Sequence, residues 1–126
     1  MPPASESTTT MQASPGSQNE AFSAIPVRNP AIRLETTPQG NARISYPVQL
    51  KPWLASMLPS QTPLPMRLLE LDAMGSFVWQ LIDGKNSVED ISTRVADHYA
   101  FHPSEARQSV AAFIRRLGQR GIVVLR

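Results

Sequence analysis

Few residues in this sequence have the types and spacing that chemistry requires. The two histidines, His98 and His102, are four residues apart, a spacing that lets two side chains hold a metal ion from one helical face. Pro103 follows directly and ends or restarts a helix at that point, and no third ligand is in view. We therefore interpret both histidines as surface residues and predict no metal site.

Other catalytic patterns are also missing from the sequence. Asp72 and Asp83 are better explained as a helix cap and a turn residue than as an acid and base pair. The six glycines form no loop that would cradle a phosphate. The absence of cysteine excludes a disulfide framework, a thiolate metal site and a cysteine nucleophile. We predict no active site and no cofactor.

Length and charge narrow the class of protein. With 126 residues, of which 12 are proline, the chain is long enough for one small domain and a tail. The formal net charge of +2 is too small to imply nucleic-acid binding by itself. Residues 1–20 lack the layout of a secretory signal, and no later segment is apolar enough to span a bilayer. We expect a soluble, cytoplasmic protein with no membrane partner.

The amino-terminal part differs in composition from the rest. Residues 1–29 are rich in Ser, Thr, Pro, Gln and Ala, which bury too little apolar surface to become ordered, so we predict a disordered or loosely attached tail. The domain then covers residues 30–126. It opens with two alternating apolar and polar segments, residues 32–36 and 42–46, separated by turn residues 38–41. This pattern predicts a β-hairpin.

A proline-rich insertion, residues 49–65, follows the hairpin. Its apolar centre around Trp53 has helical spacing, which predicts one or two helical turns between prolines. Trp53 beside Lys51 would suit a segment that docks on a membrane surface or a face that binds a partner protein. Because the run is short and has a single flanking cation, we favour a flap that closes over the domain core.

A candidate third strand, residues 66–71, leads straight into the first predicted helix. The apolar residues from Leu71 to Ile82 recur at helical spacing, Asp72 can cap the amino end, and Gly84 stands where the helix must end. A second helix follows almost at once. This close succession predicts a helix-turn-helix pair.

Two further helix signals complete the domain. Ser87 and Asp90 have the spacing of a capping box, which predicts a second helix over residues 88–99. Pro103 suits the first turn of a third helix that ends at Gly118 or Gly121. The final apolar run, Ile122 to Leu125, predicts a short buried strand or an apolar plug on the core. A hairpin and third strand followed by a three-helix bundle amount to an α+β, winged helix-turn-helix fold.

The residues themselves point to a family. The segments concerned are Leu71-Asp72, Val78 to Gly84, Ser87 to Ile91, Tyr99, Val110, Phe113-Ile114, Leu117 and Arg120 to Ile122. They closely resemble the PqqD-like family, named for a pyrroloquinoline-quinone biosynthesis protein. The resemblance covers residues 66–123 well and extends loosely through the hairpin. The proline-rich insertion is longer than the family leads us to expect.

The resemblance implies a non-catalytic peptide chaperone, called a precursor-peptide recognition element. Such a domain binds the leader of a ribosomally made precursor peptide and presents it to a modifying enzyme, often a radical S-adenosylmethionine protein. The leader adds as an extra strand to the third strand and lies against the third helix, a mode that needs an exposed strand edge.

Carried over by position, the resemblance implies ten peptide-binding residues. They are Met66, Arg67, Leu68, Leu69 and Glu70 on the third strand, with Arg107, Val110, Ala111, Ile114 and Arg115 on the third helix. The arginines at 67, 107 and 115 would pair with acidic leader residues, and the small Ala111 would leave room for an apolar anchor. Val110 and Ile114 share a stripe with Phe113 and Leu117, so a core role competes with the groove role.

The sequence is compatible with two other functions. A winged helix often reads DNA, and arginines at 107, 115, 116 and 120 keep that alternative open. The helix that would enter the groove is acidic, with Glu89, Asp90 and Asp97, and should repel phosphate, so we do not expect a nucleic-acid partner. An adaptor that docks on a partner enzyme through Trp53 or the third helix is the other alternative. The chain is a monomer or a dimer, because free strand edges invite pairing.

Overall fold

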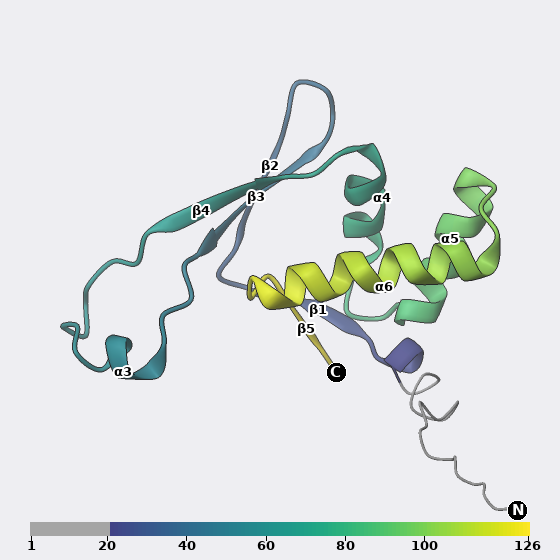
Figure 1. Cartoon of the computed structure of the whole chain (residues 1–126). Helices are drawn as coiled ribbons and strands as arrows, with labels where there is room; N and C mark the ends of the chain where they lie inside the picture. Colours follow the sequence, from purple (N-terminus) through teal and green to yellow (C-terminus); the bar gives the residue numbers. More distant parts are fainter. Residues whose placement is uncertain (1–20) are drawn as a thin grey trace, which may run out of the picture.

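The computed structural model describes residues 21–126 as a mixed α+β fold. A three-stranded sheet lies beside three helices, and a short two-stranded sheet joins the two ends of the described chain (Figure 1). In chain order the elements are β1 (Pro26–Arg28), β2 (Arg33–Thr36), β3 (Ala42–Pro47), α3 (Pro52–Ala55), β4 (Met66–Glu70), α4 (Ala73–Leu81), α5 (Val88–Tyr99), α6 (Pro103–Gln119) and β5 (Val123–Leu125).

The predicted hairpin is confirmed as β2 and β3. The two strands pair antiparallel, and the turn is closed by the Thr37 N–H, which donates to the Asn41 carbonyl at 2.8 Å. Gly40 has a φ of 85°, a left-handed conformation that glycine adopts without strain. Ile44 of β3 is fully buried in the core. The hairpin is therefore anchored in the core through β3, because all four residues of β2 are exposed.

Strand β4 is the third strand of this sheet and lies at its edge. The sheet order is β2-β3-β4, so β4 pairs with β3 alone among the described strands. Leu69 stands opposite Ile44, and Arg67 stands opposite Tyr46. Directly opposite residues project to the same face, so Arg67 and Leu69 share the face on which Ile44 and Tyr46 are buried.

The helix boundaries follow the local signals in the sequence. The Asp72 carboxylate accepts a hydrogen bond from the Gly75 N–H at 2.7 Å and caps α4. After α4, the Asp83 carboxylate accepts from the backbone N–H groups of Asn86 and Lys85, and these bonds lower the pKa of Asp83. Gly84 has a φ of 80°, which lets the chain turn directly into α5.

Helix α5 begins with the predicted capping box. The Ser87 hydroxyl accepts from the Asp90 N–H, and the Asp90 carboxylate accepts from the Ser87 N–H, both at 3.0 Å. Replacing the hydroxyl leaves one helix-end N–H without its acceptor. We expect Ser87→Ala to lower the free energy of unfolding by about 1 kcal/mol in urea denaturation. Thr93→Ala, an exposed change in the same helix, should stay within about 0.5 kcal/mol, and equal losses would contradict the capping role.

Helix α6 is the longest helix of the described chain and packs along α5. It begins after His102, whose ring nitrogen Nδ1 accepts from the Ser104 N–H at 3.1 Å, so this histidine is a capping residue. One stripe of α6 is buried in the core, and its members are Ala106, Val110, Ile114 and Leu117. Across the core they meet buried residues of α4 and α5, including Trp79 and Ile91. Within residues 21–126, no helix has the length and apolarity needed to cross a membrane.

The boundary of the amino-terminal tail needs correction. Residues 26–28 form β1 and pair antiparallel with β5, with Val27 opposite Val124. Ile25 and Arg126 exchange two backbone hydrogen bonds of 3.0 and 2.9 Å. The guanidinium of Arg28 lies 4.2 Å from the centre of the Trp79 ring, and its partial burial lowers the pKa of this arginine. The carboxyl-terminal strand β5 thus pairs with a segment whose composition does not predict a strand. Residues 1–20 of the predicted tail lie outside the described part.

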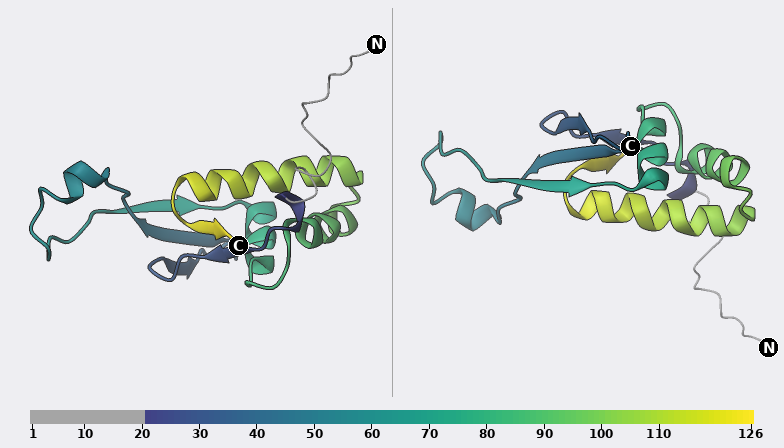
Figure 2. Two further views of the ribbon diagram at one scale, coloured as in Figure 1. Left: turned by 90° about the horizontal axis from the view of Figure 1, so that it is seen from below. Right: turned by 90° about the horizontal axis from the view of Figure 1, so that it is seen from above.

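The prediction that the Trp53 segment closes over the core is wrong. The predicted helical turn exists as α3, but α3 has no buried residue, and Trp53 and Met57 are 62% and 71% exposed. Figures 1 and 2 show α3 at the far end of the loop between β3 and β4, away from the helices. The Val48 N–H donates to the Pro65 carbonyl at 3.0 Å. This bond extends the β3–β4 ladder beyond Pro47 and Met66. The chain on either side of α3 therefore leads the segment away from the core.

Candidate functional site

A groove of about 500 Å³ lies between β4, α4 and α6. It is lined from β4, α4 and the link between them by Leu69, Glu70, Leu71, Asp72, Met74, Gly75 and Val78, and from α6 by Ser109, Val110, Ala112, Phe113 and Arg116. The groove therefore has a strand edge on one side and a helix on the other.

The strand side offers backbone hydrogen-bonding groups. The Leu71 N–H donates to the Ala42 carbonyl at 2.9 Å, which fixes which residues of β4 face β3. Because antiparallel ladders alternate, the N–H and C=O groups of residues 67 and 69 also face β3. Those of Met66, Leu68 and Glu70 point away from it. This row of backbone groups is an edge to which another strand can add.

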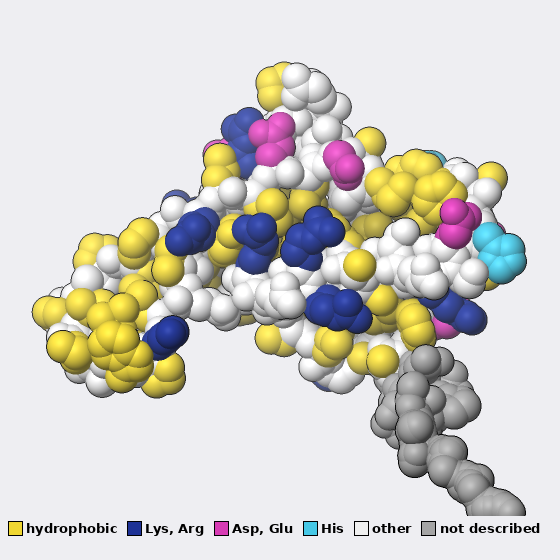
Figure 3. All heavy atoms as spheres, viewed as in Figure 1, with side chains coloured by type: hydrophobic (Ala, Val, Ile, Leu, Met, Phe, Trp, Pro, Cys, Tyr) yellow, Lys and Arg dark blue, Asp and Glu magenta, His cyan; other side chains and the backbone are white. Residues whose placement is uncertain are grey.

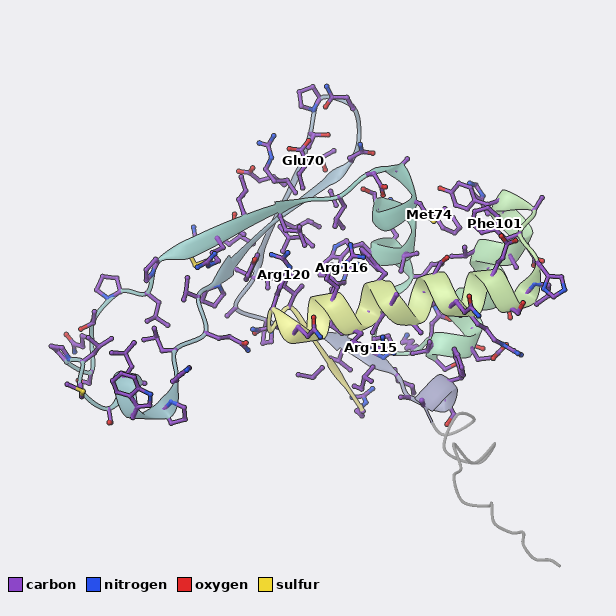
Figure 4. The ribbon with its side chains drawn as sticks, in the orientation of Figure 1. Glu70, Met74, Phe101, Arg115, Arg116 and Arg120 are labelled. Carbon is purple, nitrogen blue, oxygen red and sulfur yellow. The ribbon has the colours of Figure 1, made fainter. Side chains whose placement is uncertain are left out.

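Two arginines lie on the side of α6 that faces β4: Arg116, which lines the groove, and Arg120, which follows the last residue of the helix. The Arg120 Nη1 donates to the Tyr46 hydroxyl at 2.8 Å, and Tyr46 is opposite Arg67 in the sheet, so Arg120 lies near Arg67. Arg116 lines the groove one turn nearer to α4. In Figure 4 Arg116 and Arg120 lie on the β4 side of α6. Figure 3 shows a row of positive side chains on the surface between α6 and β4.

These arginines have no carboxylate partner within residues 21–126. The ion pairs in that range join Arg43 to Glu35 and Glu70, and Arg107 to Glu89. Arg67, Arg116 and Arg120 are exposed. The positive charge of the groove is thus available to a ligand.

The floor of the groove is apolar. Leu71, Val78 and Val110 are buried beneath it, and Met74 and Phe113 are partly buried at its α4 end. Gly75 lets α4 approach this end closely, since a Cβ there would stand 3.3 Å from the Phe113 ring. A backbone edge, an apolar floor and arginines together suit an extended peptide with apolar and acidic side chains.

The five strand residues predicted from the sequence all lie on β4, and two of them, Leu69 and Glu70, line the groove. Of the predicted helix residues, Val110 alone lines it. Val110 is 1% exposed, so its contribution is to the buried floor.

The structure does not bring the other four predicted helix residues to this groove. Arg107 donates to both carboxylate oxygens of Glu89, at 3.0 and 3.1 Å. Ala111, Ile114 and Arg115 line a separate hollow of about 740 Å³, together with residues of β5 and Phe22. Figure 4 places Arg115 on the side of α6 away from Arg116 and Arg120.

The groove residues of α6 that the prediction omitted lie on one flank of the helix. They are Ser109, Ala112, Phe113 and Arg116, and Ala112 and Phe113 each stand three or four residues from Ser109 and from Arg116. This spacing is visible in the sequence. The opposite flank, with Arg107, Ala111 and Arg115, has the same spacing, so the sequence marks two flanks without showing which faces β4.

Comparison with solved structures finds a match to the PqqD truncation of Methylobacterium extorquens PqqCD, determined by solution NMR. The TM-score is 0.54 and the sequence identity 19%, and the match covers 79% of this chain and 88% of that chain. That protein is described as a functional and stand-alone recognition element for ribosomally synthesised and post-translationally modified peptides. At this identity the match shows a shared fold. Comparison with curated proteins finds no match.

The sequence also matches a protein-family model. The family is described as Coenzyme PQQ synthesis protein D (PqqD), and the match covers residues 62–123. This range includes β4, the three helices α4 to α6 and the first residue of β5, and so contains every residue that lines the groove. Residues 62–123 of this chain thus match the PqqD family.

Proposed function

We propose that this protein is a non-catalytic precursor-peptide recognition element, which binds the leader of a ribosomally made peptide and presents it to a modifying enzyme. One observation carries the proposal: the free backbone edge of β4 faces α6 across a groove with an apolar floor and arginines. The family match and the described role of the M. extorquens protein support it. A winged helix-turn-helix arrangement and a radical S-adenosylmethionine partner enzyme belong to the same proposal.

The leader would bind as an additional strand on β4. Its backbone would pair with the outward N–H and C=O groups of Met66, Leu68 and Glu70. Every second side chain would enter the groove toward α6, because strand side chains alternate between faces. Leu68, 61% exposed on the other face, would remain accessible beside the added strand.

A titration by nuclear magnetic resonance tests this binding mode. Short peptides encoded beside the gene for this protein are added to the full chain. We expect the backbone amide signals of Leu68 and Glu70 to shift together with those of Ala112 and Arg116. Shifts confined to the α3 segment would contradict the proposal and favour the adaptor alternative, for which the exposed Trp53 is the supporting observation.

Two neighbouring alanines of α6 provide a matched test of the groove. Ala112 lines the β4 groove, whereas Ala111 lines the separate hollow next to β5. We expect Ala112→Trp to weaken leader binding at least tenfold, because the indole would occupy the space of the added strand. Ala111→Trp should leave the dissociation constant within about twofold. Equal effects in calorimetric titrations, with thermal unfolding compared for both variants, would place the binding site elsewhere.

The DNA-binding alternative loses support from the surface of α5. Glu89 and Asp90 lie in the first turn of this helix. Among the described residues, the only ion pair between an arginine and either of these acids joins Arg107 to Glu89. That pair neutralises one of the arginines on which the alternative depends. Titration with mixed-sequence duplex DNA at low salt should show no saturable binding.

A further inference from the structure

We infer that the groove selects extended peptides that carry two carboxylates at alternate positions, followed at the next alternate position by an apolar side chain. This inference rests on the proposed function and adds the chemical class of peptide. It comes from the spacing of arginines along α6 and from the change of groove character toward α4.

The spacing of the two helix arginines matches that of a strand. Arg116 and Arg120 are four residues apart, which separates them by about 6 Å along the helix axis. Side chains on one face of a strand recur about every 6.8 Å. Two carboxylates separated by one residue can therefore each reach one arginine, whereas adjacent carboxylates would point to opposite faces of the added strand.

The sheet fixes where these contacts fall. Arg120 is bound to Tyr46, which stands opposite Arg67 on β4. A carboxylate at this level would therefore lie between two arginines, one from each side of the groove. A carboxylate two positions further would lie at the level of Leu69, where Arg116 lines the groove.

The two acidic residues that line the groove do not cancel this charge. The Glu70 carboxylate lies 3.4 Å from Arg43, its partner across the β3–β4 ladder. The Asp72 carboxylate accepts from the Gly75 N–H and caps α4. Both of these acids lie at the α4 end, so the groove is positive near Arg120 and loses positive charge toward α4.

The third position of the motif follows from the floor at the α4 end. Beyond Arg116, Met74 and Phe113 line the groove and are only partly buried. A side chain four positions from the first carboxylate would reach them and would bury apolar surface there. The motif is thus acid-x-acid-x-apolar for a strand parallel to β4 and its reverse for an antiparallel strand.

Synthetic probes of known sequence test the motif on the full chain. Four eleven-residue peptides share a threonine and valine scaffold and contain Glu-x-Glu-x-Leu, its reverse, or either sequence with both glutamates replaced by glutamine. Binding is followed by the amide signals of Leu68 and Glu70 and by the side-chain Nε–H signals of Arg116 and Arg120. We expect one glutamate probe to bind about tenfold more tightly than its glutamine counterpart and to shift both arginine signals.

Arginine variants supply the matched controls. Arg116→Gln should remove about half of the preference for glutamate on a logarithmic scale, whereas Arg115→Gln, on the other side of α6, should leave it unchanged. Arg116→Glu should reverse the preference at one position, so that a probe with lysine in place of that glutamate binds more tightly than the glutamate probe.

The possible outcomes distinguish failure of the acidic motif from failure of the proposed peptide-binding function. If glutamate and glutamine probes shift the Leu68 and Glu70 amides with equal affinity, the acidic motif is overturned and strand addition stands. If Arg115→Gln lowers the preference as much as Arg116→Gln, general charge attraction explains it and the motif is again overturned. If no probe and no gene-encoded peptide shifts these amides, the proposed function fails as well.

Discussion

Leu68→Pro should weaken peptide binding at least tenfold while leaving the fold intact. The Leu68 N–H points away from β3, so its loss removes no hydrogen bond among residues 21–126 and leaves the ladder to β3 intact. Proline is tolerated on an edge strand when the missing N–H faces outward. The ring would remove one bond to the ligand and block its approach. We expect the dissociation constant for the leader to rise at least tenfold, measured by calorimetric titration.

A proline one residue further along provides the control for this experiment. Leu69 stands opposite Ile44, and its N–H points toward β3, so Leu69→Pro removes a bond of the ladder. We expect a loss of about 2 kcal/mol in the free energy of unfolding for Leu69→Pro, and less than half of that for Leu68→Pro. Unimpaired leader binding by a folded Leu68→Pro variant would exclude strand addition on β4.

Trp79→Ala should have the largest effect on stability of the substitutions considered. Trp79 is 1% exposed and lies in the core between α4 and the other helices. Its ring also supports Arg28 of β1, which stacks on it and donates to its backbone carbonyl. Removing the indole leaves a large cavity and costs about 4 kcal/mol, enough to unfold a substantial fraction of a domain this small. Urea denaturation followed by circular dichroism measures the loss.

The other tryptophan of the chain is the matched control. Trp53 is 62% exposed on α3, and no residue of that helix is buried. Trp53→Ala should therefore change the free energy of unfolding by less than about 0.5 kcal/mol. A loss comparable to that of Trp79→Ala would mean that the α3 segment packs on the domain in solution.

Local signals in the sequence were sufficient for most of the secondary structure. Helix α5 covers residues 88–99 as predicted, because the bonds between Ser87 and Asp90 depend only on residues close in the chain. The same applies to the Asp72 cap of α4 and to the hairpin turn at Gly40. Strand β1 was missed because its stability depends on β5, about 97 residues away by register, and not on its own composition.

The site shows the same division between local and distant causes. The sequence predicts β4 as the strand that receives the peptide, since its residues and the family resemblance lie in one continuous segment. It did not identify the flank of α6 that faces β4. Ala111 and Ala112 are adjacent, yet they line different hollows, because consecutive helix residues project about 100° apart.

For this protein the sequence alone determined the hairpin, the caps, the core stripe of α6 and the family. Tertiary structure decided which flank of that stripe faces the free edge of β4. A helix with apolar residues at regular spacing fixes which side is buried, but its rotation and position against a sheet depend on side-chain packing from distant segments. Here Arg120 meets Tyr46, from 74 residues earlier in the chain, and this contact places Arg116 beside the groove and Arg115 away from it.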